Sequence, residues 1–66
     1  MAWTWRYETA DGAEAAGGTS QQFPTQADAE TWIGESWQEL LGQGVDQVSL
    51  LEDERVAYGP MGLRPA

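Results

Sequence analysis

The sequence contains no cysteine, no histidine and no lysine among its 66 residues. The lack of cysteine excludes a disulfide framework, and the lack of cysteine and histidine together removes the usual ligands of a structural zinc site. Most nucleophile and general-base arrangements also need one of these three residue types. We therefore expect no metal, no cofactor and no catalytic residue, and we predict that the chain is not an enzyme.

Only carboxylates and hydroxyls remain for chemistry near neutral pH. A carboxylate pair of the glycosidase kind needs a cleft that desolvates one acid, and a domain of this size has little room for one. The run Glu52-Asp53-Glu54 offers hard oxygen ligands, but it lacks the spacing and the glycine of a calcium-binding loop. A solvated hairpin tip is the preferred interpretation of these three residues.

Basic residues are also scarce. Eleven carboxylates face three arginines, and the formal net charge is −8. Such a charge repels nucleic acids and anionic lipid surfaces, and it attracts basic protein surfaces. No basic N-terminal region precedes an apolar run, and no stretch approaches the ~20 apolar residues of a membrane span. We expect a cytoplasmic protein that binds neither membrane nor nucleic acid directly.

What the sequence does have is large aromatic side chains: four tryptophans, two tyrosines and one phenylalanine. A chain of this length buries only about 60% of the surface that its unfolded form exposes, so residues 1–66 are expected to form one domain with a small core. Because each aromatic side chain can bury about 150–250 Å², most of them are expected in that core.

The first predicted element is a strand over residues 2–9, in which Trp3, Trp5 and Tyr7 alternate with polar side chains. A turn at Asp11-Gly12 follows. Residues 13–18 are too small and flexible to predict a convincing strand, so residues 11–22 are interpreted as a loop or a frayed hairpin arm, with 21–23 rejoining the sheet.

A helix is predicted from the N-cap Thr25, with Asp28 in a capping-box-like position, through Leu41 to Gly42 or Gly44. Gly34 inside it is interpreted as a close approach to a strand or loop. At 100° per residue one broad arc is mostly apolar and the opposite side is acidic. The arc contains Ala29, Trp32, Ile33, Ser36, Trp37, Leu40 and Leu41.

Two β-rich runs, 45–51 and 55–59, flank the acidic turn and predict a hairpin. A two-residue turn pairs Leu51 with Val56, whereas a three-residue loop pairs Leu50 with Val56 and gathers four apolar residues on one face. We prefer the three-residue loop, and we expect the Gly- and Pro-rich tail after residue 59 to be irregular, with Met61 and Leu63 packing down.

These elements predict an α+β fold: a three- to four-stranded, mainly antiparallel sheet with one amphipathic helix packed on one face. The other face is then solvated or covered by a partner. It is expected to be lined by Thr4, Arg6, Glu8, Ser49, Leu51 and Ala57.

The function hypothesis is an acidic interaction module, an adaptor or regulator, that binds a basic protein surface. The candidate partner-binding residues are the acidic helix stripe, its neighbouring tryptophan and the hairpin tip: Asp28, Trp32, Glu35, Glu39, Glu52, Asp53 and Glu54. One alternative is a nucleic-acid mimic that inhibits a DNA- or RNA-binding protein. Another is a structural homo-oligomer, such as a homodimer formed through the open sheet face.

Three stretches, MAWTWRYETADG, QADAETWIGESWQELL and VSLLEDERVAYGPMGL, resemble small acidic proteins of actinobacteria to which no activity is assigned. The resemblance covers nearly the whole chain. It implies a cytoplasmic bacterial protein, and it implies no catalytic or binding residue.

Overall fold

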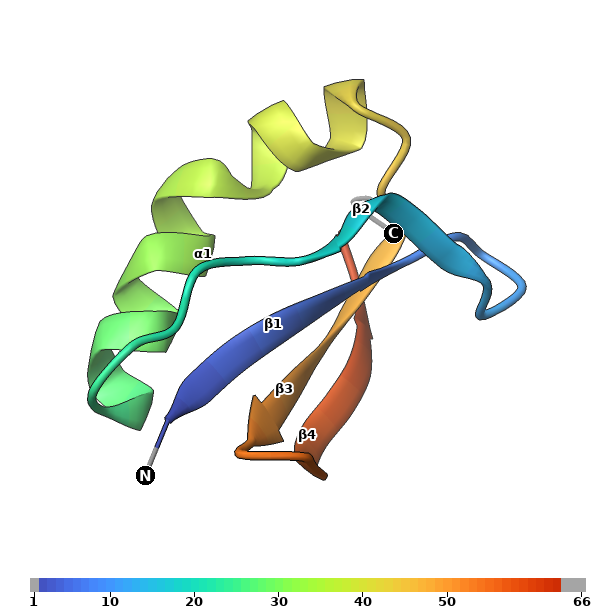
Figure 1. Cartoon of the computed structure of the whole chain (residues 1–66). Coiled ribbons are helices and arrows are strands. Elements are labelled where there is room, and N and C mark those ends of the chain that lie inside the picture. The colour runs from blue at the N-terminus through green and yellow to red at the C-terminus, as the bar shows by residue number, and fades with distance from the viewer. Residues whose placement is uncertain (1, 64–66) are drawn as a thin grey trace.

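A four-stranded antiparallel sheet and one helix make up the computed structural model, which describes residues 2–63 (Figure 1). In the sheet the strand order is β2-β1-β3-β4, so the first and third strands are central. The predicted α+β fold with one helix packed on the sheet is confirmed. The elements are β1 (Trp3–Glu8), β2 (Glu14–Thr19), α1 (Gln26–Gly42), β3 (Gln47–Glu52) and β4 (Arg55–Gly62).

The alternation of β1 divides its side chains between the two faces of the sheet. Trp5 and Tyr7 are buried, and Arg6 between them is exposed. The indole Nε1 of Trp5 donates a hydrogen bond of 2.8 Å to the backbone oxygen of Ala29 in α1. Trp5 therefore fills the core and also fixes the helix to the sheet, because an indole N–H buried in a core needs such an acceptor.

The segment after the first turn is a strand, β2, so of the two interpretations of residues 11–22, a loop or a frayed hairpin arm, the hairpin arm is the correct one. β2 pairs antiparallel with β1, and Arg6 lies opposite Thr19. The side-chain pattern does not predict this strand, because Ala16, Gly17 and Gly18 have positive φ and carry little apolar surface. The strand is defined by its backbone hydrogen bonds instead. The expected return of residues 21–23 to the sheet is confirmed at Phe23, which forms an isolated bridge with Trp3.

Helix α1 begins and ends as predicted. The Thr25 side chain accepts a hydrogen bond of 3.1 Å from the backbone N of Asp28, and the helix ends at Gly42 with Gly44 at φ 94°. Ala29, Ile33 and Leu40 of the predicted arc are buried, and Trp32, Trp37 and Leu41 pack against them half-buried. Gly34 is a correction: nothing lies within 4 Å of the Cβ that another residue would place there.

The β3–β4 hairpin has a two-residue turn, so the preferred three-residue register was wrong. Leu51 lies opposite Val56, and Asp53 takes a φ of 56°. The favoured two-residue hairpin turns need positive φ at their first residue, and aspartate tolerates it, so the turn forms without glycine. An irregularity between Leu50 and Leu51 then shifts the register and places Tyr58 opposite Leu50.

The Gly- and Pro-rich tail is also more regular than expected, because β4 continues to Gly62. Gly59 has a φ of 113° and lies so close to β3 that an added Cβ would be 2.9 Å from the Cα of Ser49. Glycine therefore lets the strand approach its neighbour instead of ending it. Met61 and Leu63 pack down as predicted, and Arg64 of the tail lies outside the described residues.

Candidate functional site

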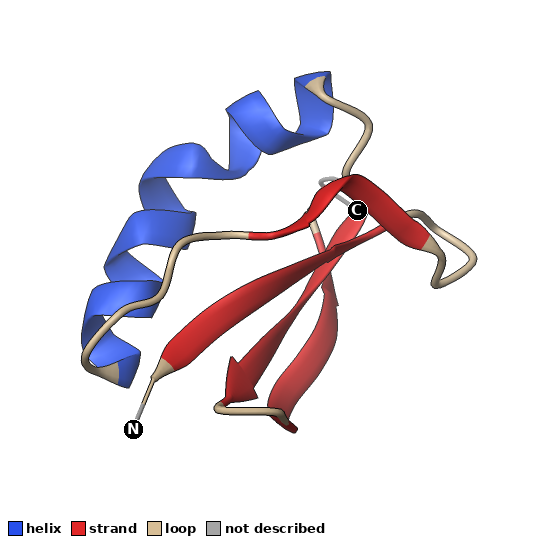
Figure 2. Cartoon of the chain, in the orientation of Figure 1, coloured by secondary structure: helices blue, strands red, loops and turns tan. Residues whose placement is uncertain are grey.

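Helix α1 packs on one side of the sheet (Figure 2), and by helical period the acidic stripe forms an outer face of this helix, away from its buried residues. Asp28, Glu35 and Glu39 are all exposed there. They follow one another at spacings of seven and four residues, which return to the same side of a helix. The helix sequence contains no lysine or arginine, so no i,i+4 ion pair compensates these charges.

Trp32 stands beside this stripe and is held in place. Its ring lies 5.4 Å from that of Phe23, centroid to centroid, at an interplanar angle of 47°. The side chain is half-buried against the core cluster. It therefore presents a fixed, partly exposed aromatic edge next to the carboxylates, which is the kind of residue that anchors protein interfaces.

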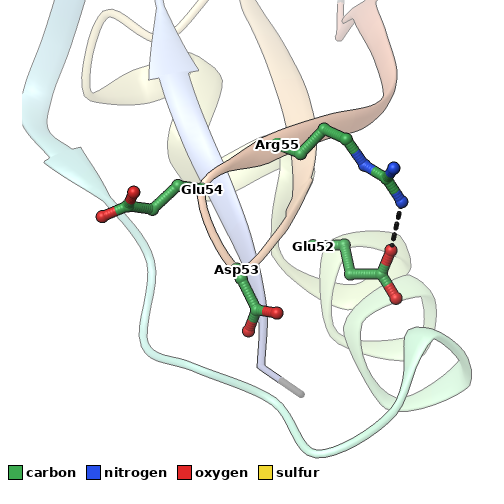
Figure 3. Close-up of a pocket in the computed structure, with 4 residues that line it drawn as sticks. All are labelled: Glu52, Asp53, Glu54 and Arg55. Carbon is green, nitrogen blue, oxygen red and sulfur yellow. Dashed lines mark hydrogen bonds and ion pairs between the residues drawn. The ribbon is translucent and has the colours of Figure 1, made fainter.

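The hairpin tip is mostly occupied by contacts within the chain. Glu52 pairs with Arg55 at 2.9 Å, and Asp53 accepts a hydrogen bond of 2.9 Å from the backbone N of Ala2. An open depression of about 410 Å³ lies among the tip residues. Figure 3 shows Glu54 pointing away from Glu52 and its arginine, so the three carboxylates do not converge.

The structure separates the two predicted parts of the site. The tip lies at the end of the β3–β4 hairpin, and α1 rises away from that end of the sheet (Figure 1). Among residues 2–63, no group of three or more acidic side chains is placed to hold a metal ion. The helix stripe and the tip thus belong to different elements, α1 and the β3–β4 turn.

Both arginines of the described residues are engaged in ion pairs. Arg6 pairs with Glu8 at 2.7 Å, and Arg55 pairs with Glu52. Neither pair lies on the helix, because all four of these residues belong to strands. Within residues 2–63, both cations are thus used on the sheet and neither compensates the acidic stripe.

Glu8 and Ser49 correct the prediction of a solvated sheet face. Glu8 is 5% exposed and Ser49 is 1% exposed, and the backbone of Gly59 lies against Ser49. Glu8 accepts hydrogen bonds from Arg6 at 2.7 Å, Gln47 at 3.0 Å and Ser49 at 3.3 Å. The i,i+2 spacing of Arg6 and Glu8 is the one sequence signal that could have indicated this network.

The charge of Glu8 is stabilised where it lies. Burial raises the pKa of the Glu8 carboxyl, but the hydrogen bonds from Arg6, Gln47 and Ser49 and the charge of Arg6 outweigh burial and hold the pKa below its usual value. A lowered pKa suits a structural anion, whereas a general acid needs a raised one. The network therefore stabilises the sheet.

Sequence reasoning missed a groove between α1 and β4. It has a volume of about 390 Å³ and is lined by Gln26 and Glu30 of the helix and by Tyr58 and Met61 of the strand. The preferred three-residue register counted Tyr58 among the four apolar residues on one face of the hairpin, yet this side chain is 58% exposed. No periodicity in the sequence indicates this groove, because it depends on where the helix crosses the sheet.

Within residues 2–63, no helix combines the length and the apolar character needed to cross a membrane. The resemblance to small actinobacterial proteins stays a prediction. Comparison with protein-family models, with curated proteins and with solved structures finds no match to this chain.

Proposed function

We propose that this chain is a cytoplasmic bacterial adaptor or regulator that binds a basic protein surface through the outer face of α1. The observation that carries the proposal is the stripe of Asp28, Glu35 and Glu39, exposed on a helix without one basic residue. Trp32 beside the stripe supplies the apolar contact.

The geometry of the stripe defines what it can recognise. Asp28 and Glu39 are eleven residues apart, which is about 16 Å along a helix. This span is about twice the Debye length of ~8 Å at physiological ionic strength, so a single cation cannot interact with both ends. The matching partner surface is a row of lysine or arginine side chains that runs along the helix.

Charge and apolar contact have different effects in such a complex. Long-range attraction by the stripe raises the association rate, and its effect falls as salt is added. Contact with Trp32 acts mainly on the dissociation rate, because a desolvated aromatic anchor is lost only when the complex separates. At the hairpin tip, Glu52 is neutralised by Arg55, so we assign the tip a smaller part, carried by Glu54.

The proposal is tested by capture from a lysate of the source organism with the tagged chain, followed by stepped salt elution and identification of the retained proteins. Two variants change the net charge equally, Glu35→Lys on the stripe and Glu14→Lys on β2, and both sites are exposed. A basic protein that is retained by the wild type and by Glu14→Lys, but not by Glu35→Lys, supports the proposal.

Retention that falls equally in both variants contradicts a specific surface, because only net charge then matters. The double variant Glu35→Lys/Glu39→Lys extends the test to the purified partner, whose unchanged affinity would refute the proposal. Displacement of that partner by nucleic acid would assign the chain the role of a nucleic-acid mimic instead. A self-association constant measured in parallel tests the homo-oligomer.

A further inference from the structure

The groove between α1 and β4 has one charged wall and one aromatic wall. Glu30 and Gln26 form the helix side, and Tyr58 and Met61 form the strand side. We infer that this groove binds an arginine side chain of a partner protein, with the guanidinium between the Glu30 carboxylate and the Tyr58 ring. This site is separate from the outer face of α1 and does not depend on its function.

The exposure of Tyr58 is the first argument. Tyr58 at 58% and Val56 at 45% are the large hydrophobic residues exposed in residues 2–63. A domain of this size depends mainly on buried aromatic rings for its stability. A ring that stays outside the core therefore contributes little to folding. The ring stands in a groove whose volume falls at the lower end of the ~300–1,000 Å³ range of ligand pockets.

The position of the helix explains why the groove is open. Helix α1 makes its principal sheet contacts with β1, through residues such as Trp5. β4 is two strands away from β1, at the edge of the sheet. The ring of Tyr58 is therefore beside the helix and not beneath it.

Charge complementarity selects the occupant. Glu30 accepts a hydrogen bond of 3.0 Å from the Gln26 side chain, which orients the carboxylate, and within residues 2–63 Glu30 makes no ion pair. The arginine of β4, Arg55, is paired with Glu52 instead. A planar guanidinium can stack on a tyrosine ring and donate to a carboxylate at the same time, which a lysine ammonium does less well.

A partner strand that pairs with the edge strand β4 fits this side of the sheet less well than an inserted arginine side chain. The pairing of β3 with β4 is irregular between Val48 and Leu50 and between Leu50 and Leu51. Pro60 on β4 has no N–H to donate. Edges interrupted in this way resist pairing with another chain, so recognition through an inserted side chain is favoured.

The test uses carbon-13 methyl NMR of Met61, one of two methionines in the chain. The probe is the peptide acetyl-Gly-Arg-Gly-amide, titrated at about 0.15 M salt, where the Debye length of ~8 Å limits the influence of distant charges. We expect a saturable shift of the Met61 methyl signal and a smaller one with the lysine peptide. A peptide with citrulline in place of arginine keeps the shape without the charge and should not bind.

The matched variants are Glu30→Gln inside the groove and Glu35→Gln on the outer helix face, which remove the same charge. Exposed ion pairs and exposed cation–π contacts each correspond to about a two- to fivefold change in affinity, so Glu30→Gln and Tyr58→Leu should each weaken binding by that factor. Glu35→Gln should leave it unchanged. The inference is overturned if Met61 does not respond, if citrulline binds equally, or if Glu35→Gln weakens binding as much as Glu30→Gln.

Discussion

Replacing Glu8 with alanine should destabilise the sheet more than any exposed acidic substitution. The change leaves three donors, Arg6, Gln47 and Ser49, without the carboxylate that they share. Ser49 is 1% exposed and cannot turn to water, whereas the Arg6 side chain is 45% exposed and can. Most of the cost therefore falls on the buried hydroxyl and on the lost acceptor beside it.

The magnitude follows from these exposures. An unsatisfied buried hydroxyl costs about 1–3 kcal/mol, and loss of a half-exposed ion pair adds up to about 1 kcal/mol, so Glu8→Ala should lower the free energy of unfolding by about 1–4 kcal/mol. Domains of this length have a total of roughly 3–10 kcal/mol, so this loss is a large share of the stability. Glu8→Gln keeps an acceptor and should cost about 1–2 kcal/mol.

The same group predicts how stability depends on pH. The pKa of Glu8 is lower in the folded chain than in the unfolded chain, so the unfolded state takes up the proton first as the solution is acidified. The stabilisation by this carboxylate is complete above the unfolded pKa of about 4.3 and is lost as pH falls through the folded pKa. The gap in stability between wild type and Glu8→Gln should therefore narrow below about pH 4.3.

Urea unfolding followed by tryptophan fluorescence measures these quantities, because four tryptophans report on the core. Glu14→Gln is the control: Glu14 lies opposite Glu8 in the pairing of β1 with β2 but is exposed, so its change should stay within about 0.5 kcal/mol. A Glu8→Ala protein as stable as wild type refutes the reasoning. So does a gap between wild type and Glu8→Gln that is the same at pH 7 and pH 3.

Three further predictions concern two glycines and the N-cap of the helix, and thermal unfolding checks all of them. Gly34→Ala should stabilise the chain by about 0.5–1 kcal/mol, because the added methyl meets nothing within 4 Å and alanine favours helix. Gly59→Ala should destabilise the chain by about 1–3 kcal/mol or more, because φ is 113° and the new Cβ would press on Ser49. Equal effects of the two glycine substitutions would contradict this reasoning. Thr25→Ala should lower the free energy of unfolding by about 1 kcal/mol through loss of the N-cap, whereas Thr25→Ser should keep most of this stability. An unchanged thermal midpoint in Thr25→Ala would show that the cap is dispensable.

Helix α1 and strand β1 could be predicted because their side chains carry the signal. Trp5 and Tyr7 mark a two-residue period, and the cap at Thr25 marks where the helix begins. β2 could not be predicted in this way, since Ala16 and its neighbouring glycines provide no periodic apolar face. Its existence follows from backbone hydrogen bonds to β1, which leave no side-chain pattern in the local sequence.

Some parts of the candidate site could likewise be predicted from the local side-chain pattern, and other parts could not. The outer stripe could be placed from helical period alone, because Glu35 and Glu39 need only the helix to share a face. The burial of Glu8 could not, because its hydrogen-bond partners Gln47 and Ser49 come from another strand, β3. Nor could the groove at Tyr58, because an irregularity in the β3–β4 register between Leu50 and Leu51 places this residue opposite Leu50.

The two proposed surfaces lie on different sides of one helix, and this decides whether one ligand segment can use both. At 100° per residue, Glu30 is about 140° from Glu35 and about 180° from Glu39 around the axis of α1. A single extended segment that places an arginine against Tyr58 therefore cannot lie along the outer stripe as well. A partner that engages both must wrap around the helix or present two separate basic elements, and changes at Glu30 and Glu35 should then affect its affinity independently.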